Sequence, residues 1–165
     1  MERIFLKKME IKIHLSLFFL FLFVHRTWTV SAITNCNQLI NINSAKGSYV
    51  LQNDIDCAGH NFLSIGYYIG SGGQSFCGSI DGKGHKIGNL SLSYSGYCYV
   101  GFIEAGIGVT ISNIVFENFQ VSAGSEDYIG LVFGKATSCT VNNVILTSSQ
   151  GKTNNIKGGG KKYKI

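Results

Sequence analysis

The chain repeats one phrase, and this repetition limits its fold more than any other feature. The copies are GSIDGKGHKIGNL at 78–90, GFIEAGIGVTISNI at 101–114 and GLVFGKATSCTVNNV at 130–144. Each copy opens on glycine and closes on a β-branched residue, a spacer, Asn and an aliphatic residue. One unit of this size cannot bury its own apolar face, so repeated units stack on their neighbours. The sequence therefore predicts a stacked repeat architecture.

Short apolar runs separated by glycine turns predict strands rather than helices. No window carries an apolar stripe with a period of 3.6 residues, and the 21 glycines oppose long helices. We therefore expect an all-β fold. The expected strands lie within residues 48–56, 62–69, 87–92, 97–103, 109–121, 128–133 and 139–146.

Residues 1–32 have the composition of an export signal. Three lysines precede an apolar stretch over 13–24, and Val30-Ser31-Ala32 supplies small residues before a cleavage point. The stretch is far shorter than the roughly 20 residues that span a bilayer. We predict a signal peptide cleaved after Ala32, a secreted or extracellular surface location, and no membrane span in the mature chain. An uncleaved anchor is the alternative, although His25 and Arg26 interrupt the apolar run.

The charge distribution argues against nucleic-acid binding. Five basic and two acidic residues in 1–32 account for +3 of the net charge of +5, and the remaining +2 arises because the five lysines of the tail outweigh a net −3 in residues 33–151. Residues 33–151 carry four lysines against seven acids, so the repeat domain, predicted to span 33–150, has no basic excess. The tail, 151–165, is rich in Gly and Lys and has little to bury, which predicts disorder and no capping role.

The five cysteines all follow the predicted signal, in a compartment expected to be oxidising. Cys36, Cys57, Cys77 and Cys98 are 21, 20 and 21 residues apart, close to one coil of a solenoid. Equivalent positions on adjacent coils lie about 4.8 Å apart, within reach of a disulfide. We predict a bridge between Cys57 and Cys77; the alternative is a set of small buried residues. Because the number is odd, at least one cysteine stays unpaired or joins another chain.

The repeated phrase has an asparagine as its next-to-last residue each time: Asn89, Asn113 and Asn143. Asparagine tolerates the left-handed backbone of a sharp bend, and its amide can bond equivalent amides above and below. We predict that these three residues form a structural ladder. Asn89 also opens the glycosylation sequon Asn89-Leu90-Ser91. A buried ladder amide cannot carry a glycan, so the two roles compete, and we expect the ladder.

Four stretches resemble the GLUG-type repeats of large secreted and surface proteins. They are YVLQNDIDCAGHNFLSIG (49–66), FCGSIDGKGHKIGNLSL (76–92), YVGFIEAG (99–106) and YIGLVFGKA (128–136). The resemblance covers residues 47–147 and implies a right-handed, single-stranded parallel β-helix with an adhesin-like role. Phe133 departs from it by separating two glycines that the family brings closer together.

The resemblance also implies long arrays, whereas this chain holds only a few coils. An open final coil exposes strand edges and apolar side chains unless something covers them. We therefore expect either self-association through the C-terminal coil or a segment truncated from a longer repeat protein.

Three acids give the alternative function. Asp54 and Asp56 project from one side of a predicted strand, and Asp81 lies one coil later, so their spacing suits the carboxylate pair of a polysaccharide hydrolase. The same positions belong to the turns of the repeat motifs, so we favour bonds to turn amides. His60 and His85 lack a second ligand at fixed spacing, and we expect no metal or cofactor.

A tyrosine group gives the expected binding surface. Tyr67, Tyr68 and Tyr94 flank the loop at 70–75 and are suited to stacking on sugars, with packing as the alternative. The sequence thus predicts a non-enzymatic surface or secreted segment that recognises a surface protein or glycan, or serves as a scaffold.

Overall fold

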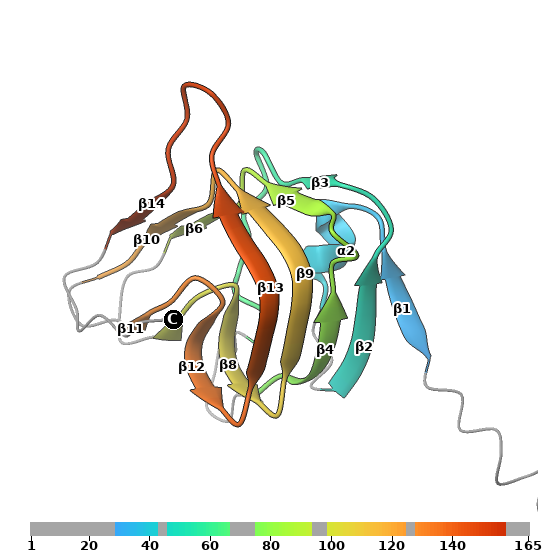
Figure 1. Cartoon of the computed structure of the whole chain (residues 1–165). Coiled ribbons are helices and arrows are strands. Elements are labelled where there is room, and N and C mark those ends of the chain that lie inside the picture. Colours follow the sequence, from blue (N-terminus) through green and yellow to red (C-terminus); the bar gives the residue numbers. More distant parts are fainter. Residues whose placement is uncertain (1–28, 43–45, 67–74, 94–98, 125–127, 158–165) are drawn as a thin grey trace, which may run out of the picture.

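The computed structural model describes residues 29–42, 46–66, 75–93, 99–124 and 128–157, with side chains to residue 154 (Figure 1). Within these ranges the chain is mostly strand, with one short helix, α2 (Cys36–Ile40), which confirms the all-β expectation. The strands are β1 (Val30–Ile33), β2 (Lys46–Leu51), β3 (Ile55–Asp56), β4 (Cys77–Asp81), β5 (Lys86–Gly88), β6 (Ser91–Ser93), β7 (Tyr99–Val100), β8 (Ile103–Ile107), β9 (Thr110–Glu117), β10 (Gln120–Ser122), β11 (Tyr128–Ile129), β12 (Phe133–Thr137), β13 (Thr140–Thr147) and β14 (Asn155–Lys157).

Parallel pairing organises these strands. In the part of the chain that the structure describes, every named pair is parallel, and each central strand pairs with its equivalent about one repeat later. Leu92 thus lies opposite Val121, and Ile55 lies opposite Ile87. We call each such stretch of chain a level. Parallel strands need a long connection, and here the rest of the level supplies it.

Four sheets result from this stacking (Figure 1). The largest has the order β1-β2-β4-β9-β5-β3, with β13 on the outer side of β9; the others are β14-β10-β6, β11-β7 and β12-β8. The long strands β9 and β13 bend at Asn113 and Asn143, which have φ of 54° and 51°. Because each of these strands continues past its bend, one sheet can cover two faces of the molecule.

Identical register places apolar residues in columns inside the sheets. Ile80 faces Ile111, Ile87 faces Phe116, and all four side chains are fully buried. Aromatic rings fill the centre: Phe102 lies 5.8 Å from Phe62 and 5.0 Å from Phe116 between ring centroids. Each fully buried side chain of this size contributes about 1.5–3 kcal/mol. The core therefore comes from stacking levels and not from any one of them.

The N-terminal end of the stack is covered by α2. Asn35 caps this helix, because its side chain accepts a hydrogen bond from the backbone N–H of Gln38. Two residues of the helix, Cys36 and Leu39, have buried side chains. A disulfide joins Cys36 to Cys57, which directly follows β3. The cap is thus both packed and covalently held.

The predicted bridge between Cys57 and Cys77 is wrong, because Cys57 pairs with Cys36 and Cys77 is a free thiol. Equivalent residues of neighbouring levels are about 30 residues apart, as Asn113 and Asn143 are, so Cys57 and Cys77 are separated by less than one level. Cys77 faces Lys46 at the start of the level, whereas the backbone N–H of Cys57 bonds Gly88 after the corner. Sequence spacing alone therefore named the wrong partner.

In two segments the structure differs from the predicted domain boundaries. The expected cleavage point after Ala32 falls within β1, which pairs with β2 over Val30–Ile33, while residues 1–28 lie outside the described ranges. Residues 155–157, predicted to be disordered, form β14 and pair with β10. Backbone pairing requires no apolar side chain, so the polar composition of this segment did not reveal that it forms a strand.

Loss of the disulfide will test the cap. We expect the double substitution Cys36→Ser and Cys57→Ser to lower the free energy of unfolding by about 3 kcal/mol, because the bridge closes a loop of 21 residues. Urea titration measures this, and Cys77→Ser is the matched control, with an expected change below about 1 kcal/mol. A non-reducing peptide map that links Cys57 to Cys77 would contradict the assignment.

Candidate functional site

The first polar array is a ladder of side chains at the bend of β9 and β13. The amide of Asn143 donates to Oδ1 of Asn113 at 2.9 Å, and the amide of Asn113 donates to Oδ1 of Asp81 at 3.0 Å. Asn143 lies opposite Asn113 on the neighbouring level, whereas Asp81 lies opposite Ser112, the residue before Asn113. Asn113 and Asn143 thus bond each other as the predicted ladder requires. The next member of the ladder is Asp81, in the place where Asn89 was expected.

Asn89 belongs to a second ladder. Its amide donates to Asp56 at 2.8 Å, and its Oδ1 accepts from the amide of Asn118 at 3.1 Å. The backbone N–H and hydroxyl of Ser149 both donate to Oδ1 of Asn118, which closes this ladder. A single ladder of Asn89, Asn113 and Asn143 is therefore wrong in its first member.

The spacing explains the correction. Asn113 follows Asn89 by less than one level, whereas Asn118 bonds Asn89 at a sequence separation of 29. Asn118 was missed because it lies outside the repeated phrase, although its position one level after Asn89 is a usable signal. All of these asparagines have positive φ, between 51° and 56°. The bends thus use asparagine for its backbone tolerance and for its amide.

The three candidate acids are all engaged in these bends. Oδ1 of Asp54 accepts from the backbone N–H of Lys86 and lies 3.2 Å from Nδ1 of His85. Asp56 accepts from Asn89 and from the backbone N–H of Ala58. Asp81 accepts from the backbone N–H of Lys83, with Nζ of Lys83 at 3.1 Å from its other oxygen.

These bonds hold the carboxylates in their charged form. The Lys86 backbone N–H lowers the pKa of Asp54, the Asn89 amide lowers the pKa of Asp56, and the Lys83 backbone N–H lowers the pKa of Asp81. A general acid in a hydrolase needs the opposite shift, so that it holds a proton near neutral pH. The arrangement suits structural acceptors. Among the described residues, no cluster of three or more His, Cys, Asp or Glu side chains is arranged to hold a metal.

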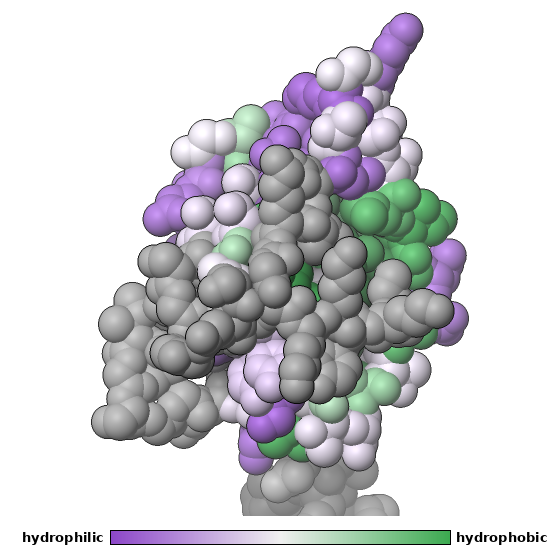
Figure 2. Space-filling model, turned by 90° about the vertical axis from the view of Figure 1, so that its left-hand side faces the viewer, coloured by the Kyte–Doolittle hydropathy of each residue, from purple (hydrophilic) through white to green (hydrophobic). Residues whose placement is uncertain are grey.

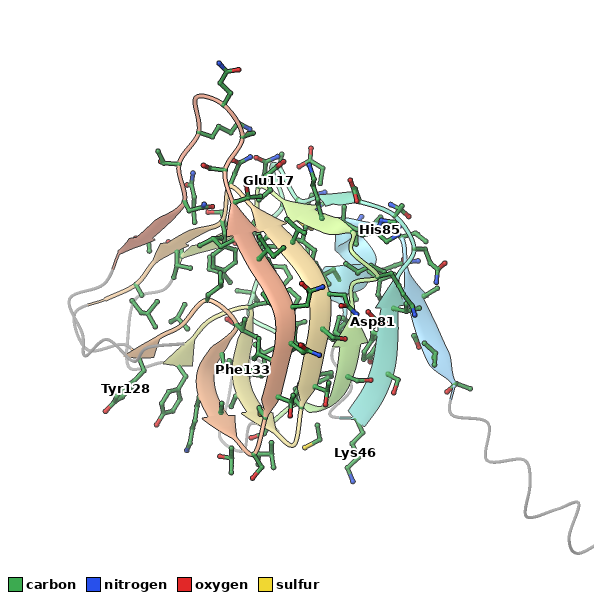
Figure 3. The ribbon with its side chains drawn as sticks, viewed as in Figure 1. Lys46, Asp81, His85, Glu117, Tyr128 and Phe133 are labelled. Carbon is green, nitrogen blue, oxygen red and sulfur yellow. A yellow bond between two sulfur atoms is a disulfide. The ribbon has the colours of Figure 1, made fainter. Side chains whose placement is uncertain are left out.

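A cavity of about 530 Å³ lies at the C-terminal end of the stack. Two of its lining residues, Tyr128 and Phe133, lie away from Asp81 and His85 (Figure 3). We call it the end cavity. It lies over β11, β12 and the start of β13, and its walls are apolar or aromatic apart from Lys135. The lining residues are Tyr99, Tyr128, Gly130, Leu131, Val132, Phe133, Gly134, Lys135, Ala136, Cys139 and Val141.

Burial falls sharply at this end of the core columns. Val141 continues the column of Ile80 and Ile111 but is 42% exposed, and Leu146 continues the column of Ile87 and Phe116 but is 38% exposed. Figure 2, which faces the left-hand side of Figure 1, shows an apolar area among hydrophilic surface. The expected apolar opening at the last level is therefore present in the described residues.

A tyrosine pair borders the end cavity. The rings of Tyr99 and Tyr128 stack at 5.2 Å, and Nζ of Lys135 lies 5.2 Å from the centroid of Tyr99. The two tyrosines lie opposite each other in the pairing of β11 with β7. The tyrosines predicted to bind a ligand, Tyr67, Tyr68 and Tyr94, lie outside the described residues, so that surface stays a prediction.

Comparison with known proteins gives one distant similarity. No family model and no solved structure matches the chain. The chain is 29% identical over 143 residues to halomucin of Haloquadratum walsbyi, an overlap of 79% of this chain and 2% of that protein. The chain thus spans only a small part of the relative's length. Among the residues that the structure describes, no helix is long and apolar enough to cross a membrane.

Substitutions at Asn113 will separate its two contributions. We expect Asn113→Ala to lower the free energy of unfolding by about 2–3 kcal/mol, because two hydrogen bonds are lost and Ala is strained at positive φ. Asn113→Gly removes the amide without the strain and should cost about 1–2 kcal/mol. Asn142→Ala, at an exposed position of β13, is the control for urea titration. Equal effects of the Asn113 and Asn142 substitutions would contradict the ladder.

Acidification will test the charged acceptors. The pKa values of Asp54, Asp56 and Asp81 are lowered in the folded chain, so their stabilising effect is complete above the unfolded pKa of about 3.9 and is lost as pH falls through the folded values. Urea midpoints should stay level from about pH 7 to 5 and decline below about pH 4. Asp81→Asn should reduce this decline. An unchanged pH profile in that variant would argue against the role of Asp81.

Proposed function

We propose that the chain is a non-enzymatic segment of a secreted or surface-exposed protein, folded as a right-handed parallel β-helix of the GLUG type. Its role is recognition or adhesion, or the support of neighbouring domains as a scaffold. The observation that carries this proposal is the use of the polar side chains: the acids and amides at the bends bond one another across levels.

Parallel stacking supports the β-helix. Equivalent residues follow one another up the stack, as Ser48, Ser79, Thr110 and Thr140 do in the largest sheet. Each level adds about 30 residues, and the polar ladders lie at the same bends in successive levels. Such a stack is stiff, because each level contacts only its neighbours along a continuous core.

A surface location is supported by three observations. Residues 1–32 have the composition of a signal peptide, and a disulfide closes the N-terminal cap, as is common in exported proteins. The similarity to halomucin adds a relative whose name denotes a mucin. A glycan or another surface protein is the partner class that we propose.

The sequon at Asn89 stays unmodified in this proposal. The amide nitrogen that would carry the glycan donates to Asp56, and the amide oxygen accepts from Asn118 and from Nζ of Lys152. Glycosylation would break the ladder at its centre. Asn89 therefore serves the fold and not the attachment of sugar.

A polysaccharide panel will test the non-enzymatic role. Protein expressed from this sequence and collected from the medium is first weighed intact, and we expect a mass that corresponds to the loss of residues 1–32 with no added hexose. It is then incubated with neutral and acidic polysaccharides. We expect the protein to bind some of them and to release no new reducing ends, which would indicate cleavage. The variants Asp54→Asn, Asp56→Asn and Asp81→Asn should behave as the wild type does.

Two outcomes would overturn the proposal. Cleavage that is lost in one of these variants, with an unchanged circular dichroism spectrum, would make the chain a hydrolase. Retention inside the cell as an uncleaved chain would remove the surface role. If the protein is secreted but binds none of the polysaccharides, the scaffold role remains and the recognition of these glycans is excluded.

A further inference from the structure

The end cavity has the size and the lining of a ligand site. Its volume of about 530 Å³ falls within the range of about 300–1,000 Å³ that is typical of pockets for small molecules. Such pockets are mostly apolar and carry a few polar groups that orient the ligand. Here Leu131, Val132 and Phe133 supply apolar wall, while tyrosine hydroxyl groups and one ammonium group supply polar contacts. The cavity therefore suits a molecule with both apolar and polar faces.

The ammonium group belongs to Lys135, the only charged residue among the described residues that line the cavity. In the part of the chain that the structure describes, Lys135 takes part in no salt bridge, whereas Lys83 and Lys86 each lie within 3.3 Å of a carboxylate oxygen. Its Nζ lies 5.2 Å from the centroid of the Tyr99 ring, and this contact holds the ammonium group beside the cavity. A negatively charged group on the ligand complements this position.

The positive charge is specific to this level of the stack. In the pairing of β12 with β8, the residue opposite Lys135 is Ala105. The neighbouring column keeps its side chain, because Tyr128 lies opposite Tyr99. The stack thus repeats the tyrosine but folds with alanine in the place of the lysine one level earlier. Lys135 is therefore not required by the repeat itself.

The other lining groups match a sugar. Phe133 is half-buried and lines the cavity, and the face of an aromatic ring attracts the polarised C–H groups of a pyranose. The phenol hydroxyl of Tyr99 both donates and accepts hydrogen bonds, as the hydroxyl groups of a sugar do. A sugar that also carries a carboxylate has a partner for each of these groups and for Lys135.

We infer that the end cavity binds a uronic-acid residue of an acidic polysaccharide. Its carboxylate pairs with the ammonium group of Lys135, its pyranose ring packs on Phe133, and its hydroxyl groups bond the phenol of Tyr99. A charge-assisted hydrogen bond of this kind is stronger than a bond between neutral groups. The inference rests on the proposed recognition of a glycan, and it names the class of glycan and the place where it binds.

Calorimetric titration of the secreted protein with oligogalacturonate will test the site. The matched ligand is the same oligosaccharide after its carboxylates have been reduced to alcohols. We expect the wild type to bind the acidic form about tenfold more tightly than the reduced form, and Lys135→Gln to lose this preference. Affinity for the reduced form should be the same in both proteins, because the lost contact requires the carboxylate. Lys135→Arg should keep the preference for the acidic form.

Two matched controls separate the cavity from general effects of charge. Lys86→Gln removes a lysine outside the lining and should leave both affinities unchanged. Val141→Glu places a carboxylate in the lining and should weaken binding of the acidic form about tenfold, whereas Ile145→Glu places the same charge on β13 outside the lining and should not. Val141 and Ile145 are 42% and 51% exposed, and circular dichroism verifies that each variant is folded.

Three results would overturn the inference, and they leave different parts of the proposed function standing. Equal affinity of the wild type for the acidic and reduced forms would exclude the pairing with the carboxylate but keep glycan recognition. A preference for the acidic form that persists in both Lys135→Gln and Val141→Glu would place the binding site elsewhere on the chain. Binding of neither form would exclude a uronic-acid site, and the polysaccharide panel then decides whether recognition of other glycans stands.

Discussion

Parallel pairing in strict register is the constraint on which the rest of this structure depends. It places like residues above like residues at a separation of about one level, so Ile80 meets Ile111 and Tyr99 meets Tyr128. The apolar columns are buried because the register repeats. A shift of one residue would turn every column to the opposite face, so the whole core fixes the register.

Polar residues solve the problem that the bends create. At the described bends the backbone turns through a residue of positive φ, and backbone hydrogen bonds between levels continue there, as from the Asn89 N–H to the Glu117 carbonyl and from the Asn118 N–H to the Thr147 carbonyl. Asn113 and Asn118 adopt this conformation, and their amides donate to Asp81 and Asn89 of the preceding level. The carboxylates of Asp56 and Asp81 terminate the two ladders on the N-terminal side. Residues that elsewhere provide catalysis are therefore used here to hold the turns.

The two ends of the stack are covered by different means. α2 and the Cys36–Cys57 disulfide close the N-terminal end with a packed helix. At the other end, Ser149 closes the ladder of Asn118, while the side that carries β11 and β12 borders the end cavity.

The sequence by itself determined the all-β fold, because its repeated phrase and glycine turns suit stacked strands and oppose helices. It also placed asparagines at bends, since few other residues tolerate their backbone. Only the tertiary structure decided which repeats meet: Asn89 with Asn118, Cys57 with Cys36, and β14 with β10. The physical reason is that connecting loops differ in length, so distance along the chain does not reveal the level, and backbone pairing is nearly blind to side-chain polarity.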